Sequence, residues 1–261
     1  LVPPLKLGFD LSTMRAERTV QMTIKIIEMD AKGERTIYDD SKSLTILPRD
    51  FLPLFRQVSE EGDIRRTPEY IGAWVTSNAT AVDKFLGQAK LLHPKKQFVG
   101  EQDETMSQVS AIFAALKARG VSYVMDPAVV SDRVKMQRTR LPADVLASTN
   151  AQCLEGTILF ATMMESIGLR PVIVLVPGHA FVGWHQSKFD KALANLPAGY
   201  PAGMVFVETT MVGTYTFEQA VNVAVNRVID ESKEGHFKNG LSQFVELTAL
   251  RSAGIRAQPM N

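Results

Sequence analysis

Three residues of the chain have side chains suited to cysteine-based acyl transfer. Cys153 is the only cysteine among the 261 residues, and His179 and Glu208 follow it in the sequence. A thiolate is a strong nucleophile, and an imidazole within hydrogen-bond reach can take the thiol proton. A carboxylate can accept the second ring N–H and fix the tautomer. The order Cys, His, acid therefore predicts a nucleophile, a base and a residue that orients the base.

A buried helix is expected directly after the cysteine, over residues 154–167. Its apolar residues recur at helical spacing, and Gly168 is placed to end it. Cys153 then falls at the helix N-terminus, where unpaired amide hydrogens and the helix dipole favour the thiolate and can receive an oxyanion. The side chains of Asn150 and Gln152 are further candidates for oxyanion donors.

The histidine and the acid are expected on neighbouring strands. Residues 171–176 form a nearly continuous run of β-branched residues, typical of a buried strand, and Pro177-Gly178 ends it. Residues 180–184 begin a second strand directly after His179, and residues 203–210 predict a third strand with Glu208 near its end. Both side chains can then lie beside the helix that begins at Cys153.

These segments resemble a known family. Residues 152–156, 177–183 and 207–210 are similar to the transglutaminase-like branch of the papain-like cysteine enzymes, most closely to bacterial transglutaminase-like domains of unassigned role. The resemblance covers roughly residues 137–210 and implies an α+β fold with a helix packed on an antiparallel sheet. It assigns catalysis to Cys153, His179 and Glu208. Glu208 stands where the family usually has aspartate, and Ala151 stands where it often has glycine.

The resemblance implies an enzyme that acts on amide bonds of a protein or peptide through a thioester. If water resolves the thioester, the enzyme is a peptidase or amidase, which is the preferred interpretation. If a lysine-type amine resolves it, the enzyme is a protein-crosslinking transglutaminase. The alternative from another class is a catalytically idle binding or scaffold module that keeps the fold. No cofactor is implied, and the oligomeric state is left open.

Composition excludes some other functions. A net charge of +1 gives no electrostatic reason for a nucleic acid or an anionic membrane as partner. No apolar run approaches the roughly 20 residues that span a bilayer. A single cysteine excludes intrachain disulfides and a cysteine-rich zinc site, and the four histidines lack the spacing of a metal motif. His185 is a weaker competitor for the catalytic histidine, whereas His93 and His236 are interpreted as surface residues.

Two domains are predicted, an N-terminal β module over 1–60 and a catalytic domain over 61–261. Residues 20–26, 36–38 and 43–47 predict three strands, hence a small sandwich-like module. Helices are expected from Thr67, over 79–92 and over 103–119. The irregular residues 126–148 and the loop 185–202 are expected to flank a cleft. The chain begins with Leu1 rather than methionine, so an upstream signal peptide or anchor and the compartment are left open.

Overall fold

The computed structural model describes residues 10, 13–31, 33–57, 59, 62–125, 136–191 and 200–258. The chain divides into two compact units, Leu1–Phe51 and Leu52–Met260. The predicted domain limits, 1–60 and 61–261, stay a prediction.

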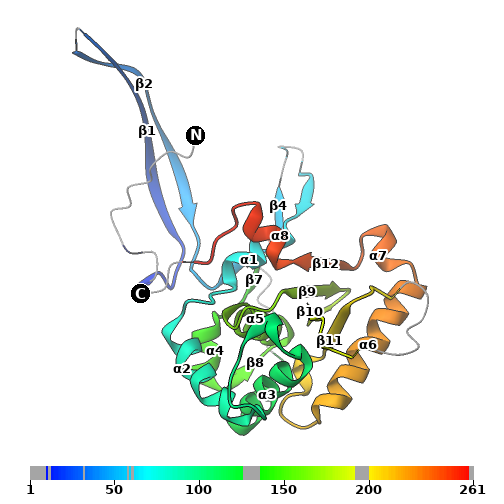
Figure 1. Cartoon of the computed structure of the whole chain (residues 1–261). Coiled ribbons are helices and arrows are strands. Elements are labelled where there is room, and N and C mark those ends of the chain that lie inside the picture. The colour runs from blue at the N-terminus through cyan, green and yellow to red at the C-terminus, as the bar shows by residue number, and fades with distance from the viewer. Residues whose placement is uncertain are drawn as a thin grey trace. The chain divides into compact units, whose positions relative to one another are not determined.

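The first unit contains one long antiparallel hairpin of β1 (Arg18–Asp30) and β2 (Gly33–Ile46), drawn in blue in Figure 1. The predicted second and third strands belong to the single strand β2. The polar residues between these two predicted strands also pair with β1. One of the cross-strand contacts is the ion pair between Lys25 and Asp39 at 3.2 Å. The described residues of this unit therefore form a hairpin and not the expected sandwich.

The second unit is built on a four-stranded antiparallel sheet with the strand order β11-β10-β9-β12. Its strands are β9 (Pro171–Val176), β10 (His179–His185), β11 (Met204–Val207) and β12 (Gln243–Glu246). Val182 of β10 lies opposite Ile173 on one side and Val207 on the other. The start of β10 and the end of β11 therefore lie at the same end of the sheet.

Helices cover both faces of this sheet (Figure 1). Helix α5 (Cys153–Ser166) packs on the face that carries Ile173 and Val182, and α6 (Phe217–Lys233) packs on the face that carries Val174. Successive strand residues point to opposite faces, so one strand contributes to both clusters of apolar side chains. Because α5 is buried along nearly its whole length, its position is fixed by packing.

Shorter helices and strands surround this core. The remaining helical segments are η2 (Pro68–Tyr70), α1 (Ile71–Trp74), α2 (Thr80–Ala89), η3 (Lys90–Leu92), η4 (Gly100–Gln102), α3 (Thr105–Ala118), α4 (Pro142–Ser148), η5 (Thr209–Met211), α7 (His236–Asn239) and α8 (Leu247–Ser252). The short strands pair as β3 (Phe51–Pro53) with β7 (Met136–Arg138), β4 (Phe55–Gln57) with β5 (Ile64–Arg66), and β6 (Ser122–Tyr123) with β8 (Asn150–Ala151).

The predicted α+β class is confirmed, because helices pack on antiparallel strands. The structure differs from the sequence interpretation at several places of this unit: the expected strand 203–210 ends at Val207, and residues 136–138 form strand β7. Residues 142–148 form helix α4 rather than an irregular segment, with Pro142 in its first turn, where its fixed φ suits a helix start. Residues 243–246 add an edge strand to the central sheet. No helix in the described part of the chain has both the length and the apolar character to cross a bilayer.

Two glycine substitutions test the packing of this unit. A Cβ on Gly183 would lie 2.4 Å from Cδ1 of Phe206, whereas a Cβ on Gly87 of α2 meets nothing within 4 Å. We expect Gly183→Ala to lower the free energy of unfolding by about 1–3 kcal/mol through overpacking. Gly87→Ala is expected to raise it by up to about 1 kcal/mol through helix propensity. Chemical denaturation measures both, and equal effects of the two variants would contradict the packing of β10 on β11.

Candidate active site

The nucleophile candidate begins the central helix. Cys153 is the first residue of α5, follows the N-cap Gln152 and is partly exposed. The first amide groups of a helix have no partner within it, so they are available to a ligand or a negative charge. The sequence therefore folds locally to present a thiol at the electropositive end of a buried helix.

The sheet brings the other two candidates together. His179 is the first residue of β10, and Glu208 directly follows β11. Nε2 of His179 lies 2.7 Å from Oε2 of Glu208. The charged partner places the proton on Nε2, so Nδ1 is the ring nitrogen left for the sulfur.

The charge state of His179 reflects both neighbours. Its pKa is raised to about 9, first by the hydrogen bond with Cys153 and then by the hydrogen bond with Glu208, against a lowering by burial. The ordinary value is 6.5, so the imidazole carries a proton at neutral pH. A protonated imidazole beside sulfur stabilises the thiolate form by charge attraction.

Glu208 is held rigidly in this arrangement. Burial raises the pKa of its carboxyl, but the hydrogen bond from His179 and the donors of Thr210 outweigh burial and leave that pKa below its ordinary value. Oε1 accepts hydrogen bonds from the backbone N–H of Thr210 at 3.0 Å and from its hydroxyl at 2.7 Å. The carboxylate is therefore ionised and oriented toward the histidine. Thr210 was not singled out from the sequence.

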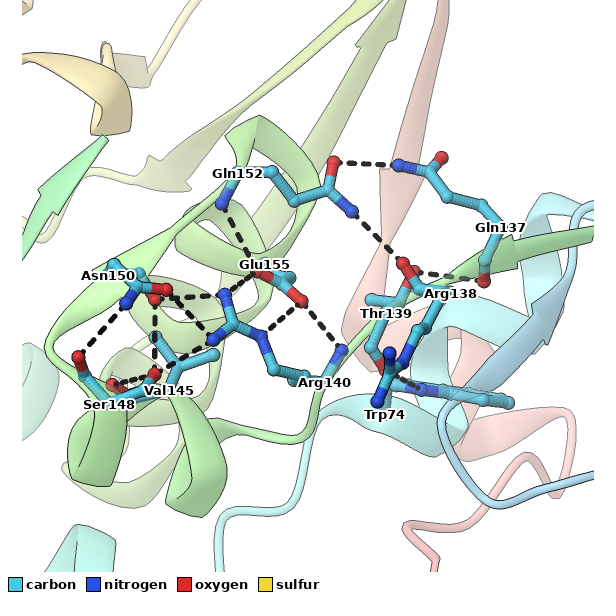
Figure 2. A network of polar contacts seen from close by, with 10 residues as sticks. All are labelled: Trp74, Gln137, Arg138, Thr139, Arg140, Val145, Ser148, Asn150, Gln152 and Glu155. Carbon is cyan, nitrogen blue, oxygen red and sulfur yellow. Dashed lines mark hydrogen bonds and ion pairs between the residues drawn. The ribbon is translucent and has the colours of Figure 1, made fainter. Parts of the chain in front are cut away.

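A second buried carboxylate lies in the first turn of α5, as Figure 2 shows. Glu155 is 2% exposed and forms a bidentate ion pair with Arg140. Nε of Arg140 donates to Oε1 at 2.9 Å, and Nη2 donates to Oε2 at 2.6 Å. The backbone N–H of Gln152 donates to the same carboxylate at 3.1 Å. Sequence reasoning missed this pair, although a glutamate three positions after an N-cap residue is a known signal of a helix start.

The proposed side-chain donors to an oxyanion are engaged in other bonds. The amide of Asn150 donates to the Ser148 carbonyl at 3.1 Å. The amide of Gln152 donates to the Arg138 carbonyl at 3.2 Å and its carbonyl accepts from Gln137 at 2.7 Å. Asn150 also accepts from Arg140 at 2.9 Å, so its side chain is fixed toward the arginine. The backbone amides at the start of α5 are therefore the better candidates.

Tyr123 is a further residue near the site. Its pKa is raised by burial and by the negative charges of Cys153 and Glu208, although the side chain is 43% exposed. Its strand β6 runs parallel to β8, with Tyr123 opposite Ala151. Tyr123, Gln152 and Thr210 line one cavity with a volume of about 10 Å³, room for about one water molecule.

The other histidines have structural partners. His185 lies at the far end of β10 and contacts Glu246 at 2.9 Å. The interpretation of His93 as a surface residue is wrong, because it is 2% exposed and its Nε2 lies 2.9 Å from the Ser107 hydroxyl. His236 is half-buried, with Nδ1 2.8 Å from Glu231. Ser107 lies 14 positions after His93, and Glu231 lies in the preceding helix α6, so a local pattern does not reveal either partner.

Within the described ranges, no group of three His, Cys, Asp or Glu side chains is arranged to hold a metal ion. Of the expected flanking segments, residues 126–135 and 192–199 lie outside the described residues. The described part of the site consists of the start of α5, the adjoining ends of β10 and β11, and strand β6.

Comparison with known proteins gives little beyond this geometry. No protein-family pattern and no curated protein matches the chain. One similar solved structure is a crystal structure from Parabacteroides distasonis, called a "putative protease", with 14% sequence identity and a TM-score of 0.32. The match covers 74% of this chain and 41% of that chain, so this chain spans less than half the length of its structural neighbour.

The charge state of His179 can be measured by NMR titration of its ring protons. We expect a midpoint of about 9, lowered by Glu208→Gln or Cys153→Ala, because each variant removes one of the interactions that raise this pKa. Glu246→Gln, which alters the His185 pair, is the matched control and should leave the midpoint unchanged.

The same titration has a consequence for stability. Because the pKa of His179 in the folded chain lies above its ordinary 6.5, its contribution to the free energy of unfolding is complete below about pH 6.5. That contribution is lost as the pH rises through about 9. A His179 midpoint near 6.5 in the wild-type protein would contradict both expectations.

Proposed function

We propose that this chain is a cysteine-dependent acyl-transfer enzyme that acts on amide bonds, with a papain-like core of the transglutaminase-like kind. The observation that carries the proposal is the imidazole of His179, whose Nε2 lies 2.7 Å from the buried carboxylate of Glu208 and whose pKa is raised by Cys153 as well as by Glu208. A buried carboxylate that orients a histidine toward a thiol at a helix start has the geometry of an activated nucleophile.

The first half-reaction follows from these positions. The thiolate of Cys153 attacks the amide carbonyl carbon, and the carbonyl electron pair moves to oxygen. Backbone amides at the start of α5 stabilise this oxyanion. His179 then gives its proton to the leaving amine as the carbon–nitrogen bond breaks, which leaves an acyl thioester on Cys153.

The second half-reaction decides between hydrolase and transferase. In hydrolysis, the now neutral His179 takes a proton from water, the hydroxide attacks the thioester, and the thiolate leaves. In transamidation, an amine takes the place of water. Hydrolysis, hence a peptidase or amidase, remains the preferred outcome. Protein crosslinking is the alternative within the same chemistry, and an idle binding or scaffold module is the alternative without it.

Alkylation with iodoacetamide tests the activated thiol, and the whole-protein mass reports Cys153 alone because no other cysteine is present. At pH 6 we expect the wild-type protein to react at least about tenfold faster than free cysteine, because an imidazolium stabilises the thiolate. His179→Ala should lose this advantage, and Glu208→Gln should reduce it.

Cys153→Ser is the control for modification elsewhere, and thermal unfolding checks that each variant is folded. A wild-type rate no greater than that of free cysteine would reject the enzyme and favour the idle module. For an active thiol, incubation with fluorescent casein and a labelled primary amine separates the two outcomes. New short peptides indicate hydrolysis, whereas covalent incorporation of the amine into casein indicates transamidation.

A further inference from the structure

We propose that Arg140 is a positioning residue, which neutralises Glu155 and so keeps the N-terminal end of α5 electropositive toward Cys153. The inference rests on the proposed role of Cys153 as a nucleophile. It assigns a function to a pair that lies beside the candidate catalytic residues rather than among them. The role would be indirect, because Arg140 acts through the helix start and not through contact with substrate.

Every N–H group of the Arg140 guanidinium forms a hydrogen bond, and these bonds fix the side chain. Besides the two bonds to Glu155, Nη1 donates to the Ser148 hydroxyl and the Asn150 side chain, each at 2.9 Å. Nη2 also donates to the Asn150 carbonyl at 3.1 Å, and the backbone N–H of Arg140 donates to Glu155 at 2.8 Å. All five side-chain N–H groups thus have an acceptor, an arrangement that the three donors of lysine cannot reproduce.

The position of Glu155 explains why neutralisation matters. Its carboxylate accepts from the backbone N–H of Gln152, so it lies at the same helix end as Cys153. A negative charge is favourable at a helix N-terminus, but an uncompensated carboxylate there competes with a thiolate for the same dipole and repels it. The guanidinium of Arg140 removes this competition while the carboxylate keeps its hydrogen bond to the helix start.

Other charged groups around the sulfur come from different elements. His179 faces Cys153 from β10, and Glu208 acts through that histidine. Tyr123 of β6 is within reach of the charges on Cys153 and Glu208, which contribute to its raised pKa. Among these described groups, Arg140 is the cation bonded to Glu155 in the first turn of α5. A change in this pair should therefore alter thiol reactivity without removing the base.

The test compares the pH dependence of iodoacetamide alkylation between pH 4 and 9 in four proteins. Relative to wild type, Arg140→Gln should raise the midpoint of the rate profile by about one pH unit, because Glu155 is left unneutralised. Glu155→Gln should lower the midpoint below the wild-type value, because the charge of Arg140 is then uncompensated. The double variant Arg140→Gln/Glu155→Gln removes both charges, and its midpoint should lie between those of the single variants.

Arg140→Lys keeps the positive charge but cannot form the bidentate contact with Glu155, so a midpoint between those of wild type and Arg140→Gln is expected. Thermal unfolding identifies the folded variants. If Arg140→Gln does not fold, the comparison of Glu155→Gln with the double variant tests the inference instead. The midpoint of the double variant should then be about one pH unit higher than that of Glu155→Gln. Equal midpoints in the folded proteins would overturn the inference, because a merely structural pair changes stability and not thiol titration.

The wild-type profile separates this inference from the proposed function. A wild-type protein whose thiol reacts like free cysteine means that the proposed function has failed, whatever the variants show. If the wild-type thiol is reactive but the Arg140 and Glu155 variants have the same midpoint as wild type, only the role of Arg140 has failed.

Discussion

The burial of α5 is the constraint on which the rest of the site depends. Its residues from Leu154 to Met164 are all buried, so the helix is enclosed on every side. A close-packed interior does not allow such a helix to rotate or slide without opening cavities or creating overlaps. The location of Cys153 is therefore set by the apolar residues that follow it. Because β9 and β10 pack on the same helix, this core also fixes where β10 begins and hence where His179 lies.

The polar groups are fixed in a different way, through satisfaction of buried charge. Burying a carboxylate is costly unless donors replace its lost water. Glu208 receives donors from His179 and Thr210, whereas Glu155 receives them from Arg140 and Gln152. Each carboxylate thus links segments that are distant in the chain, and the loss of one donor would leave charge unpaired. Packing positions the backbone of the site, and these bonds then determine the orientation of its side chains.

Much of this arrangement could be predicted from local patterns. The helical spacing after Cys153 and the β-branched run 171–176 depend on burial of their own side chains, so both elements could be read from the sequence. Strand β12 could not be, because its short mixed pattern becomes a strand only by pairing with β9. The Arg140–Glu155 pair and the burial of His93 depend on partners 15 and 14 positions away, which local periodicity does not report.

The two carboxylates near Cys153 are paired with different cations, Glu155 with Arg140 and Glu208 with His179. This difference determines which of the two pairs can transfer a proton. The guanidinium of Arg140 stays protonated at any pH that a protein tolerates, so it can hold Glu155 but cannot give up a proton. The imidazole of His179, with a pKa of about 9, is protonated at neutral pH. Unlike a guanidinium, it can still give this proton to a leaving amine. An exchange of the two cations would place a permanent charge where a proton must move. The proposed chemistry therefore requires the histidine at the sheet end and is compatible with the arginine only as the partner of Glu155, which lies in the first turn of α5.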